Sequence, residues 1–389
     1  MKANPGGQID PSEIVGRDKL VARLWEVLQR QSLVLIAERR MGKTCVMKKM
    51  ESDHPPGVIT FDRDLEGLRS PLEFVEGVFH DVEKYLSRLE RTAVKARRLL
   101  THLSGAEVPK LGRFPSVTAA HWKVLLTNIL EDLADHQSGL VVLFWDEMPM
   151  MLKNIKDSSG EAVALEILDT LRSLRHTHAS LRMVYTGSIG LHNVIRSLKR
   201  SGNPDDPTND MQTEDVPPLS RPDAIELAQK LFAGEGLQGA DEATAAAIAD
   251  SVDCIPYYVH HVVDQMKHRG TATDPASVRQ LIAACLIEPQ DPWHLQHYRD
   301  RIDDYYDEAD RPFMLAMLDA LATAQSPLTF GEVYRHVKAK VVTDDEERVL
   351  GLLGLLKRDH YACPELDGRV RFSFSLVKRW WGLSRGLTQ

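Results

Sequence analysis

Hydrophobic and polar positions follow two alternating patterns in the first half of the chain. Short, continuously apolar runs predict buried strands at Leu33–Ile36, Val58–Phe61, Leu140–Trp145 and Met183–Thr186. The segments between them repeat apolar residues at intervals of three and four, as in "SPLEFVEGVFHDVEKYLSRL" and "HWKVLLTNILEDLADH", which predicts amphipathic helices. Strands that alternate with helices predict an α/β fold, in which helices cover both faces of a parallel sheet.

The pattern changes after the fourth predicted strand. The segment "RSGNPDDPTNDMQTEDVPPLS" is rich in Gly, Pro, Asn and Asp, which predicts a loop and a domain edge. Helical patterns alone follow, and then three helices are expected at Arg311–Ala324, Thr329–Lys338 and Asp344–Lys357, with a β-hairpin in "YACPELDGRVRFSFS". Three helices and a hairpin form a winged helix. The expected domains are therefore a sheet domain (1–215), an all-α lid (216–290) and a winged-helix domain (291–389).

Composition narrows the class of protein. The net charge of −8 over 389 residues argues against coating nucleic acid by bulk electrostatics, although it leaves room for a local basic face. No apolar run approaches the roughly 18 residues that span a bilayer, and the first residues lack the apolar core of a secretory signal. The 4 cysteines form no CxxC pair, which favours neither a disulfide framework nor a zinc site. We expect a cytoplasmic protein without a membrane segment.

The residues after the first strand carry a phosphate-binding pattern. Residues 37–44, "AERRMGKT", match GxxxxGK[ST] except at the first position, where Ala37 replaces glycine. In such a loop the backbone N–H groups face a polyphosphate, the lysine (Lys43) contacts the β- and γ-phosphates, and the hydroxyl of Thr44 binds Mg²⁺. Alanine fits the first position if its φ is negative, whereas Gly42, nearest the phosphates, is harder to replace.

A second motif, "LVVLFWDEMPMM", ends an apolar strand in two carboxylates. Asp146 is placed to orient the Mg²⁺ shell, and Glu147 to polarise a water for attack on the γ-phosphorus. Alone, the motif also fits an ordinary strand that ends in solvated acids. Together with the Gly-Lys-Thr loop it favours a catalytic site. The next strand ends in "YTGS", where Thr186 or Ser188 is a candidate contact of the γ-phosphate and a simple turn is the alternative.

In this order, the motifs resemble the STAND-type P-loop ATPases, in particular the archaeal-ATPase-like group among the AAA+ relatives, over nearly the whole chain. The resemblance implies ATP and Mg²⁺ as ligands, and a segment "IVGRDKLVARLWEVL" that lies against the adenine. The family's Gly-x-Pro lid motif corresponds to Cys254-Ile255-Pro256, without the glycine. The residues expected to bind the nucleotide are Val15, Gly16, Arg17, Arg39, Arg40, Met41, Gly42, Lys43, Thr44, Cys45, Ser188 and Pro256.

Arginine side chains offer further candidates. Arg39 and Arg40 lie inside the loop, where one of them either adds charge at the phosphates or closes on the lid. For the other candidates for an arginine finger a solvated face is the better interpretation. These are Arg175, Arg182, Arg196 and Arg200.

The leading hypothesis is an ATP-binding, slowly hydrolysing switch. Its lid and winged helix would change position with the γ-phosphate and control a protein partner or self-association. The alternative is an ATP-gated DNA-binding protein, similar to AAA+ origin initiators, that uses the winged helix. Against it, the helix that would enter the groove begins with four acids, residues 344–347. A scaffold that no longer hydrolyses ATP is a third class, which the intact Glu147 disfavours. The expected preference for adenine over guanine rests on the resemblance and on the absence of the guanine-binding motif Asn-Lys-x-Asp from the sequence.

Overall fold

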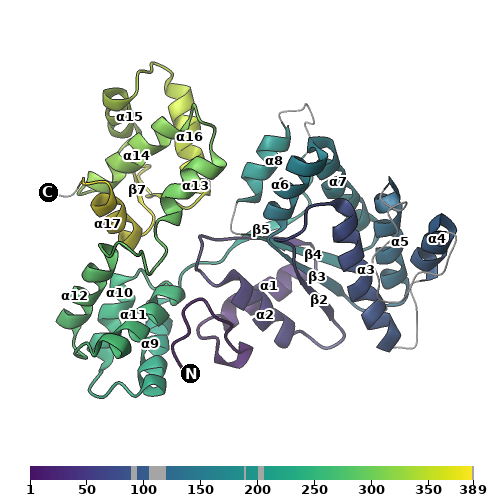
Figure 1. Ribbon diagram of the computed structural model, residues 1–389, viewed down its shortest axis with the longest axis horizontal. Helices are drawn as coiled ribbons and strands as arrows, with labels where there is room; N and C mark the ends of the chain where they lie inside the picture. The colour runs from purple at the N-terminus through teal and green to yellow at the C-terminus, as the bar shows by residue number, and fades with distance from the viewer. Residues whose placement is uncertain (89–93, 105–119, 188–189, 200–205, 388–389) are drawn as a thin grey trace. The chain divides into compact units, whose positions relative to one another are not determined.

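A parallel sheet of five strands organises the first half of the chain in the computed structural model, which describes residues 1–88, 94–104, 120–187, 190–199 and 206–387 (Figure 1). The strand order is β2-β3-β4-β1-β5, and each neighbouring pair is parallel. The expected α/β fold class is thereby confirmed. The strands are β1 (Leu33–Ile36), β2 (Ile59–Asp64), β3 (Val141–Asp146), β4 (Leu181–Thr186) and β5 (Gln212–Asp215).

Four of these strands lie where the hydrophobic pattern predicts them, with ends that differ by a few residues. The fifth corrects the prediction, because β5 lies inside the segment that we expected to be a loop. It has no apolar run, and among its residues only Glu214 is buried. Backbone pairing with β1 along its whole length, rather than burial of side chains, holds this edge strand in place.

Helices cover both faces of the sheet. Figure 1 shows helices below the sheet and above it. Those below are α1 (Asp18–Leu28) and α2 (Lys43–Ser52), and those above are α6 (Met148–Ser159), α7 (Glu161–Thr177) and α8 (Leu191–Lys199). Three more helices form a group in which the first two pack against the third: α3 (Pro71–Arg88), α4 (Val94–Ser104) and α5 (Trp122–Asp135). The interior strand β3 is buried from Val141 to Trp145, as its apolar sequence requires.

The chain divides into two compact units. The sheet unit comprises residues 19–36 and 43–216, and the helical unit comprises residues 1–18, 37–42 and 217–389. The loop residues Ala37–Gly42 thus pack with the helical unit, although β1 and α2 on either side of them belong to the sheet unit. Residues 1–18, which include a short 3₁₀ turn at Pro11–Glu13, also pack there.

From residue 217 on, the helical unit continues with four helices, as predicted from their start and stop residues. Ser220 and Asp241 cap the first two, and Asp274 caps the fourth, each by accepting backbone N–H groups. The helices are α9 (Arg221–Glu235), α10 (Glu242–Ser251), α11 (Pro256–Arg269) and α12 (Pro275–Leu286).

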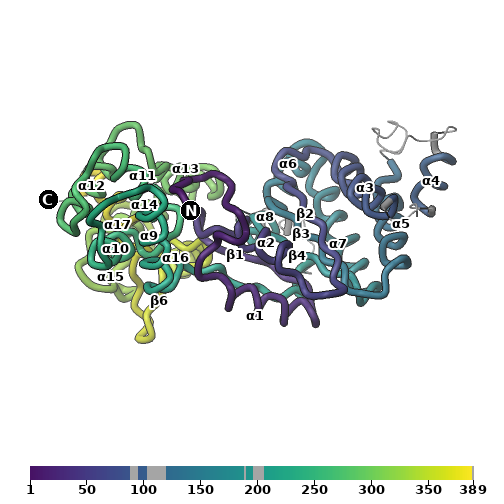
Figure 2. Tube along the Cα trace, turned by 90° about the horizontal axis from the view of Figure 1, so that it is seen from below, coloured from purple at the N-terminus to yellow at the C-terminus, as the bar shows by residue number. Residues whose placement is uncertain are grey.

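The last part of the chain contains the three predicted helices and the hairpin. Figure 2 shows the hairpin, in yellow, extending away from the helices around it. Leu328 pairs with Val370, which adds a short bridge beside the hairpin. The elements are α13 (His297–Tyr305), α14 (Arg311–Thr323), α15 (Phe330–Lys340), α16 (Glu346–Arg358), β6 (Ala362–Pro364), β7 (Val370–Phe372) and α17 (Ser375–Ser384). None of the helices in the described ranges has the length and apolar character needed to cross a bilayer.

Candidate functional site

The expected metal ligands of the sheet unit contact each other. Thr44, in the first turn of α2, donates its hydroxyl to Oδ2 of Asp146 over 2.8 Å, and the backbone N–H of Glu147 donates to Oδ1 over 3.0 Å. Burial raises the pKa of Asp146, and the hydrogen bonds from Thr44 and Glu147 oppose that shift. Lys43, at the start of the same helix, is 9% exposed. Folding therefore brings together residues that lie about a hundred positions apart in the sequence.

These two side chains suit a magnesium ion. A hydroxyl and a carboxylate are hard oxygen ligands, and Mg²⁺ in nucleotide sites typically takes one or two protein oxygens and completes its shell with phosphates and waters. Within the described ranges no group of three or more His, Cys, Asp and Glu residues could hold a metal by itself. The pair of Thr44 and Asp146 therefore fits an ion that arrives with a polyphosphate better than a resident structural metal.

Glu147 has a strained backbone. It adopts the left-handed conformation (φ 55°, ψ 32°) immediately before α6, which turns its side chain toward the end of β4. A Cβ added to Gly187 would lie 3.4 Å from Oε2 of Glu147 and 2.6 Å from Cδ of Pro149. The close approach explains why a glycine stands after β4.

Of the two candidate γ-phosphate contacts, only Thr186 can be placed. Its side chain is buried at the end of β4, and its hydroxyl has no hydrogen-bond partner in the part of the chain that the structure describes. Ser188 lies outside the described residues. A buried hydroxyl without a partner is rare, which makes Thr186 the better candidate to bind a ligand atom.

Two acidic residues of β2 were missed by the sequence interpretation. Asp64 is directly opposite Asp146 in the β2–β3 register, and Asp62 lies two residues earlier on the same face. The side chain of Asp62 reaches solvent, but its partial desolvation first, and then the charges of Glu51 and Asp146, raise its pKa to about 6. The predicted strand ends at Phe61, whereas the pattern in "FDRD" (residues 61–64), with an acid at every second position, is the signal that indicates a longer strand.

Two residues of the loop, Arg40 and Gly42, have a positive φ. Ala37 is not in the left-handed region, so alanine is acceptable at the first position of the motif. Gly42 has a φ of 86°, where any side chain would be strained. Met41 is buried and Cys45 is half-buried. Neither residue occupies one of the fixed positions of the GxxxxGK[ST] pattern.

Residues 15–17 approach the loop inside the helical unit. Arg17 is 4% exposed and donates to the backbone carbonyl of Met41 over 2.7 Å and to that of Pro217 over 2.8 Å. Gly16 has a φ of 70°, and an added Cβ would lie 2.6 Å from Cβ of Asp223. Val15 is buried beside it. Arg17 thus supports the loop backbone, a role that the sequence interpretation did not assign to it.

The two arginines of the loop differ. Arg39 is exposed, whereas Arg40 is half-buried and its guanidinium lies 4.1 Å from the centre of the Tyr257 ring. Tyr257 follows Pro256, the first residue of α11. Arg40 thus contacts α11, in the segment where the lid is expected. The side chain of Arg39 is exposed on the outside of the loop.

The turn at Cys254-Ile255-Pro256 has, at Cys254, a backbone conformation that usually requires glycine, although no glycine is present. Cys254 has a φ of 56°, and the preceding Asp253 has a φ of 52°. Pro256 then starts α11 at a position that suits proline. The carboxylate of Asp253 accepts hydrogen bonds from the Ser375 hydroxyl (2.7 Å) and the Leu376 N–H (2.8 Å), so this strained turn also caps α17.

The expectation of a solvated face was wrong for Arg175. It is 8% exposed, and it pairs with both carboxylate oxygens of Asp210 and with the hydroxyl of Tyr185. Arg182 is half-buried and donates to the carbonyl of Leu28. Both bind protein groups and have a structural role. The side chains of Arg196 and Arg200 lie outside the described residues.

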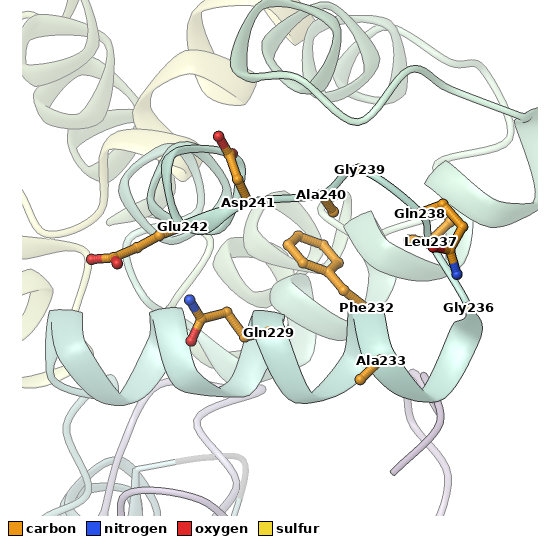
Figure 3. A pocket seen from close by; sticks show the side chains of 10 residues that line it. All are labelled: Gln229, Phe232, Ala233, Gly236, Leu237, Gln238, Gly239, Ala240, Asp241 and Glu242. Atoms are coloured by element: carbon orange, nitrogen blue, oxygen red, sulfur yellow. The ribbon is translucent and has the colours of Figure 1, made fainter.

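A hollow of about 380 Å³ lies elsewhere in the helical unit, between α9 and the segment that leads to α10 (Figure 3). Its lining includes Gln229, Phe232 and Asp241 but no residue of the phosphate loop. The residues that line this hollow do not form a second motif of the Gly-Lys-Thr type.

Comparisons with known proteins agree with the fold. No family model matches the sequence, and no curated protein matches it. Among solved structures, the chain is similar to a Walker-type ATPase of Pyrococcus abyssi, with a TM-score of 0.67 and 15% identity over 98% of this chain and 99% of that one. It is also similar to the ORC2 protein of Aeropyrum pernix in ADPNP–ADP complexes, with a TM-score of 0.55 and 10% identity over 98% of each chain. The chain therefore has the α/β fold of P-loop ATPases, followed by a helical C-terminal part.

Proposed function

We propose that the protein is an ATP-binding and hydrolysing switch. The observation that carries the proposal is the 2.8 Å hydrogen bond between Thr44 and Asp146. It joins the end of the Gly-Lys-Thr loop to the end of a buried strand, which is the arrangement that a nucleotide with its metal requires. The likeness in fold to a Walker-type ATPase supports the same conclusion.

The residues of the loop would bind the phosphates. Backbone N–H groups around Gly42 face the polyphosphate, and Lys43 adds a point charge to the β- and γ-phosphates. Mg²⁺, held by Thr44 and Asp146, would supply charge neutralisation at the phosphates when bound. Glu147 orients a water and accepts its proton as the water oxygen bonds to the γ-phosphorus. The bond from that phosphorus to the β–γ bridging oxygen breaks, which releases ADP and phosphate.

The helical unit would be the part that responds to the nucleotide. Residues 37–42 pack with this unit, so an occupant of the loop acts on it directly. We propose that residues 216–290 form a lid and residues 291–389 a winged-helix domain, and that both shift with the γ-phosphate to expose or hide a protein-binding surface. The helices α14, α15 and α16, the hairpin and the Leu328–Val370 bridge support the winged-helix assignment.

DNA binding through the hairpin has less support. Arg371 pairs with Glu365 over 2.5 Å, and Arg369 with Asp367 over 3.3 Å, so acids of the hairpin itself neutralise its bases. The first turn of α16 contains Glu346 and Glu347, which would repel phosphates. We therefore favour a protein partner or self-association. A mobility-shift assay with duplex DNA, with and without ATP, separates the two proposals, because salt-sensitive binding that needs ATP would favour DNA.

The proposal is tested by ATP binding and phosphate release. We expect Lys43→Ala to abolish binding of a fluorescent ATP analogue while the circular dichroism spectrum stays that of the parent. Glu147→Gln should retain binding and lose phosphate release. Lys230→Ala, which removes an exposed lysine paired with Glu226 on α9, serves as the control and should change neither. Equal affinity of the parent and Lys43→Ala for the analogue would overturn the proposed function.

A further inference from the structure

The N-terminus of α17 is capped from a distant part of the helical unit. Phe374, the residue before the helix, provides no side-chain acceptor for the first N–H groups of α17. The carboxylate of Asp253 supplies one, because Oδ2 accepts the N–H of Leu376 over 2.8 Å and Oδ1 accepts the Ser375 hydroxyl over 2.7 Å. Asp253 stands 123 residues before Leu376, in the turn that leads to α11.

The turn that contains Asp253 has an unfavourable backbone conformation. Asp253 and Cys254 have φ values of 52° and 56°, and such residues persist where the surrounding structure fixes them. The N–H of Cys254 donates to the carbonyl of Ala249 on α10 over 2.9 Å, and its carbonyl accepts the N–H of Leu219, just before α9, over 3.1 Å. These bonds fix the turn relative to α9 and α10 while its carboxylate caps α17.

The other end of the turn reaches the phosphate loop. Pro256 and Tyr257 form the start of α11, and the guanidinium of Arg40 lies 4.1 Å from the centre of the Tyr257 ring. Arg40 has a φ of 74°, so this contact holds a loop residue in a conformation that is uncommon for arginine. Residues 37–42 and 217–389 belong to the same compact unit, so the whole path from the loop to α17 lies within the helical unit.

The helix α17 is in turn joined to α14. Trp381 of α17 is fully buried, and its Nε1 donates to Oδ1 of Asp319 on α14 over 3.0 Å. Arg385, directly after α17, donates to both carboxylate oxygens of Asp319. A displacement of α17 therefore acts on α14, the first of the three helices in the expected winged helix.

We infer that Asp253 is a positioning residue of the nucleotide site, through which the phosphate loop and α17 act on each other. The inference rests on the proposed function and names a route by which the C-terminal part of the chain regulates it. A nucleotide that orders the loop holds Arg40 against Tyr257, keeps the turn in place and stabilises the cap of α17. Coupling between two sites is reciprocal, so the capped α17 raises the affinity of the loop for nucleotide by the same factor.

Hydrogen exchange at the start of α17 measures one side of this coupling. The N–H of Leu376 exchanges when its bond to Asp253 opens, and mass spectrometry of peptides that cover residues 374–380 follows it. In the parent, we expect a saturating nonhydrolysable ATP analogue with Mg²⁺ to slow this exchange by about fivefold or more. In Tyr257→Leu, also saturated with the analogue, the slowing should be lost. Unchanged exchange in the parent with the analogue bound would overturn the inference.

The nucleotide affinity of Asp253 variants measures the other side. Asp253→Gly removes the carboxylate and accepts the φ of 52° without strain, and we expect its affinity for a fluorescent ATP analogue to fall by about fivefold to tenfold. Asp253→Asn keeps an acceptor and tolerates the left-handed conformation, so it should bind within about twofold of the parent. Reciprocity requires that the loss of affinity in Asp253→Gly and the slowing of exchange in the parent agree within about threefold.

A control removes another helix cap from the same unit. Asp274 accepts the N–H groups of Ala276 and Ser277 at the start of α12, over 2.9 Å and 3.0 Å. Asp274→Ala should therefore lower the stability of the protein and leave its nucleotide affinity unchanged.

Two results of the affinity measurements would overturn the inference. One is parental affinity of Asp253→Gly, and the other is an equal loss of affinity in Asp274→Ala, because the defect would then reflect a general loss of stability. A parent that binds the analogue no better than Lys43→Ala does would instead overturn the proposed function and the inference with it.

Discussion

The guanidinium of Arg40 stacks on the ring of Tyr257, with 4.1 Å between its central carbon and the ring centre. Arg40 has a φ of 74°, a conformation that arginine adopts only at a cost. The contact therefore holds a strained residue of the phosphate loop against the first turn of α11. A cation over an aromatic face at a partly buried site contributes about 1 to 2 kcal/mol.

Removing that aromatic face should weaken ATP binding. We expect Tyr257→Leu to lower the affinity for a fluorescent ATP analogue by about fivefold to thirtyfold, because Arg40 loses its partner and the loop samples other conformations. Tyr257→Phe keeps the face and should bind like the parent. Equal losses in both variants would show that the hydroxyl, rather than the ring, supports the loop.

Gly187 should be required for hydrolysis. In Gly187→Ala the new Cβ would lie 2.6 Å from Cδ of Pro149, so the start of α6 must shift and carry Glu147 with it. We expect phosphate release to fall by about tenfold or more, while ATP affinity changes little, since a misplacement of about 1 Å is enough to impair a catalytic group. Single-turnover kinetics and analogue binding measure the two quantities. Gly67→Ala, where an added Cβ meets nothing within 4 Å, is the control and should leave both unchanged.

Cys254 is a site where glycine should stabilise the protein. Its φ of 56° is unfavourable for any residue with a Cβ. We expect Cys254→Gly to raise the free energy of unfolding by up to about 1 kcal/mol, as measured by urea denaturation. Cys254→Ala removes the thiol but keeps the Cβ, and it should bring no such gain. A gain of the same size in both variants would attribute the effect to the thiol.

His260 should make stability depend on pH. It is 3% exposed, its Nδ1 accepts the N–H of Asn4 over 3.2 Å, and burial lowers its pKa from 6.5 to about 4. The folded state thus keeps His260 neutral while the unfolded chain takes up a proton. The contribution of neutral His260 to the free energy of unfolding is fully present above pH 6.5. It is lost as the pH falls toward 4, at about 1.4 kcal/mol per pH unit.

A variant isolates this contribution from that of the other buried histidines. His260→Asn does not titrate and keeps an acceptor near Asn4. The free energy of unfolding of this variant, measured in urea between pH 4.5 and pH 7.5, should fall less steeply toward acid than that of the parent. Identical slopes would mean that His260 is not the neutral, buried group described above.

Part of the site could be predicted because its chemistry is local. The loop is one continuous stretch, and the strand that ends at Asp146, with Glu147 after it, is another, and the residue types and spacing of each indicate its conformation. The requirement for glycine at Gly42 also follows from backbone stereochemistry alone. The prediction of strands failed where the hydrophobic signal was weak. Residues Gln212–Asp215 form a strand because they pair with β1, and they have no apolar pattern.

The sequence by itself determined the α/β pattern and the position of the Gly-Lys-Thr turn after the first strand, because hydrophobic periodicity and backbone conformation depend on near neighbours in the chain. Only the tertiary structure decided what each charge contacts. Arg175 proved to be buried against Asp210 and not solvated, and the carboxylate of Asp253 caps a helix at Leu376, 123 residues away. Charge pairs and aromatic stacking depend on distances in space, and nothing in the spacing of residues encodes which segments the fold brings together.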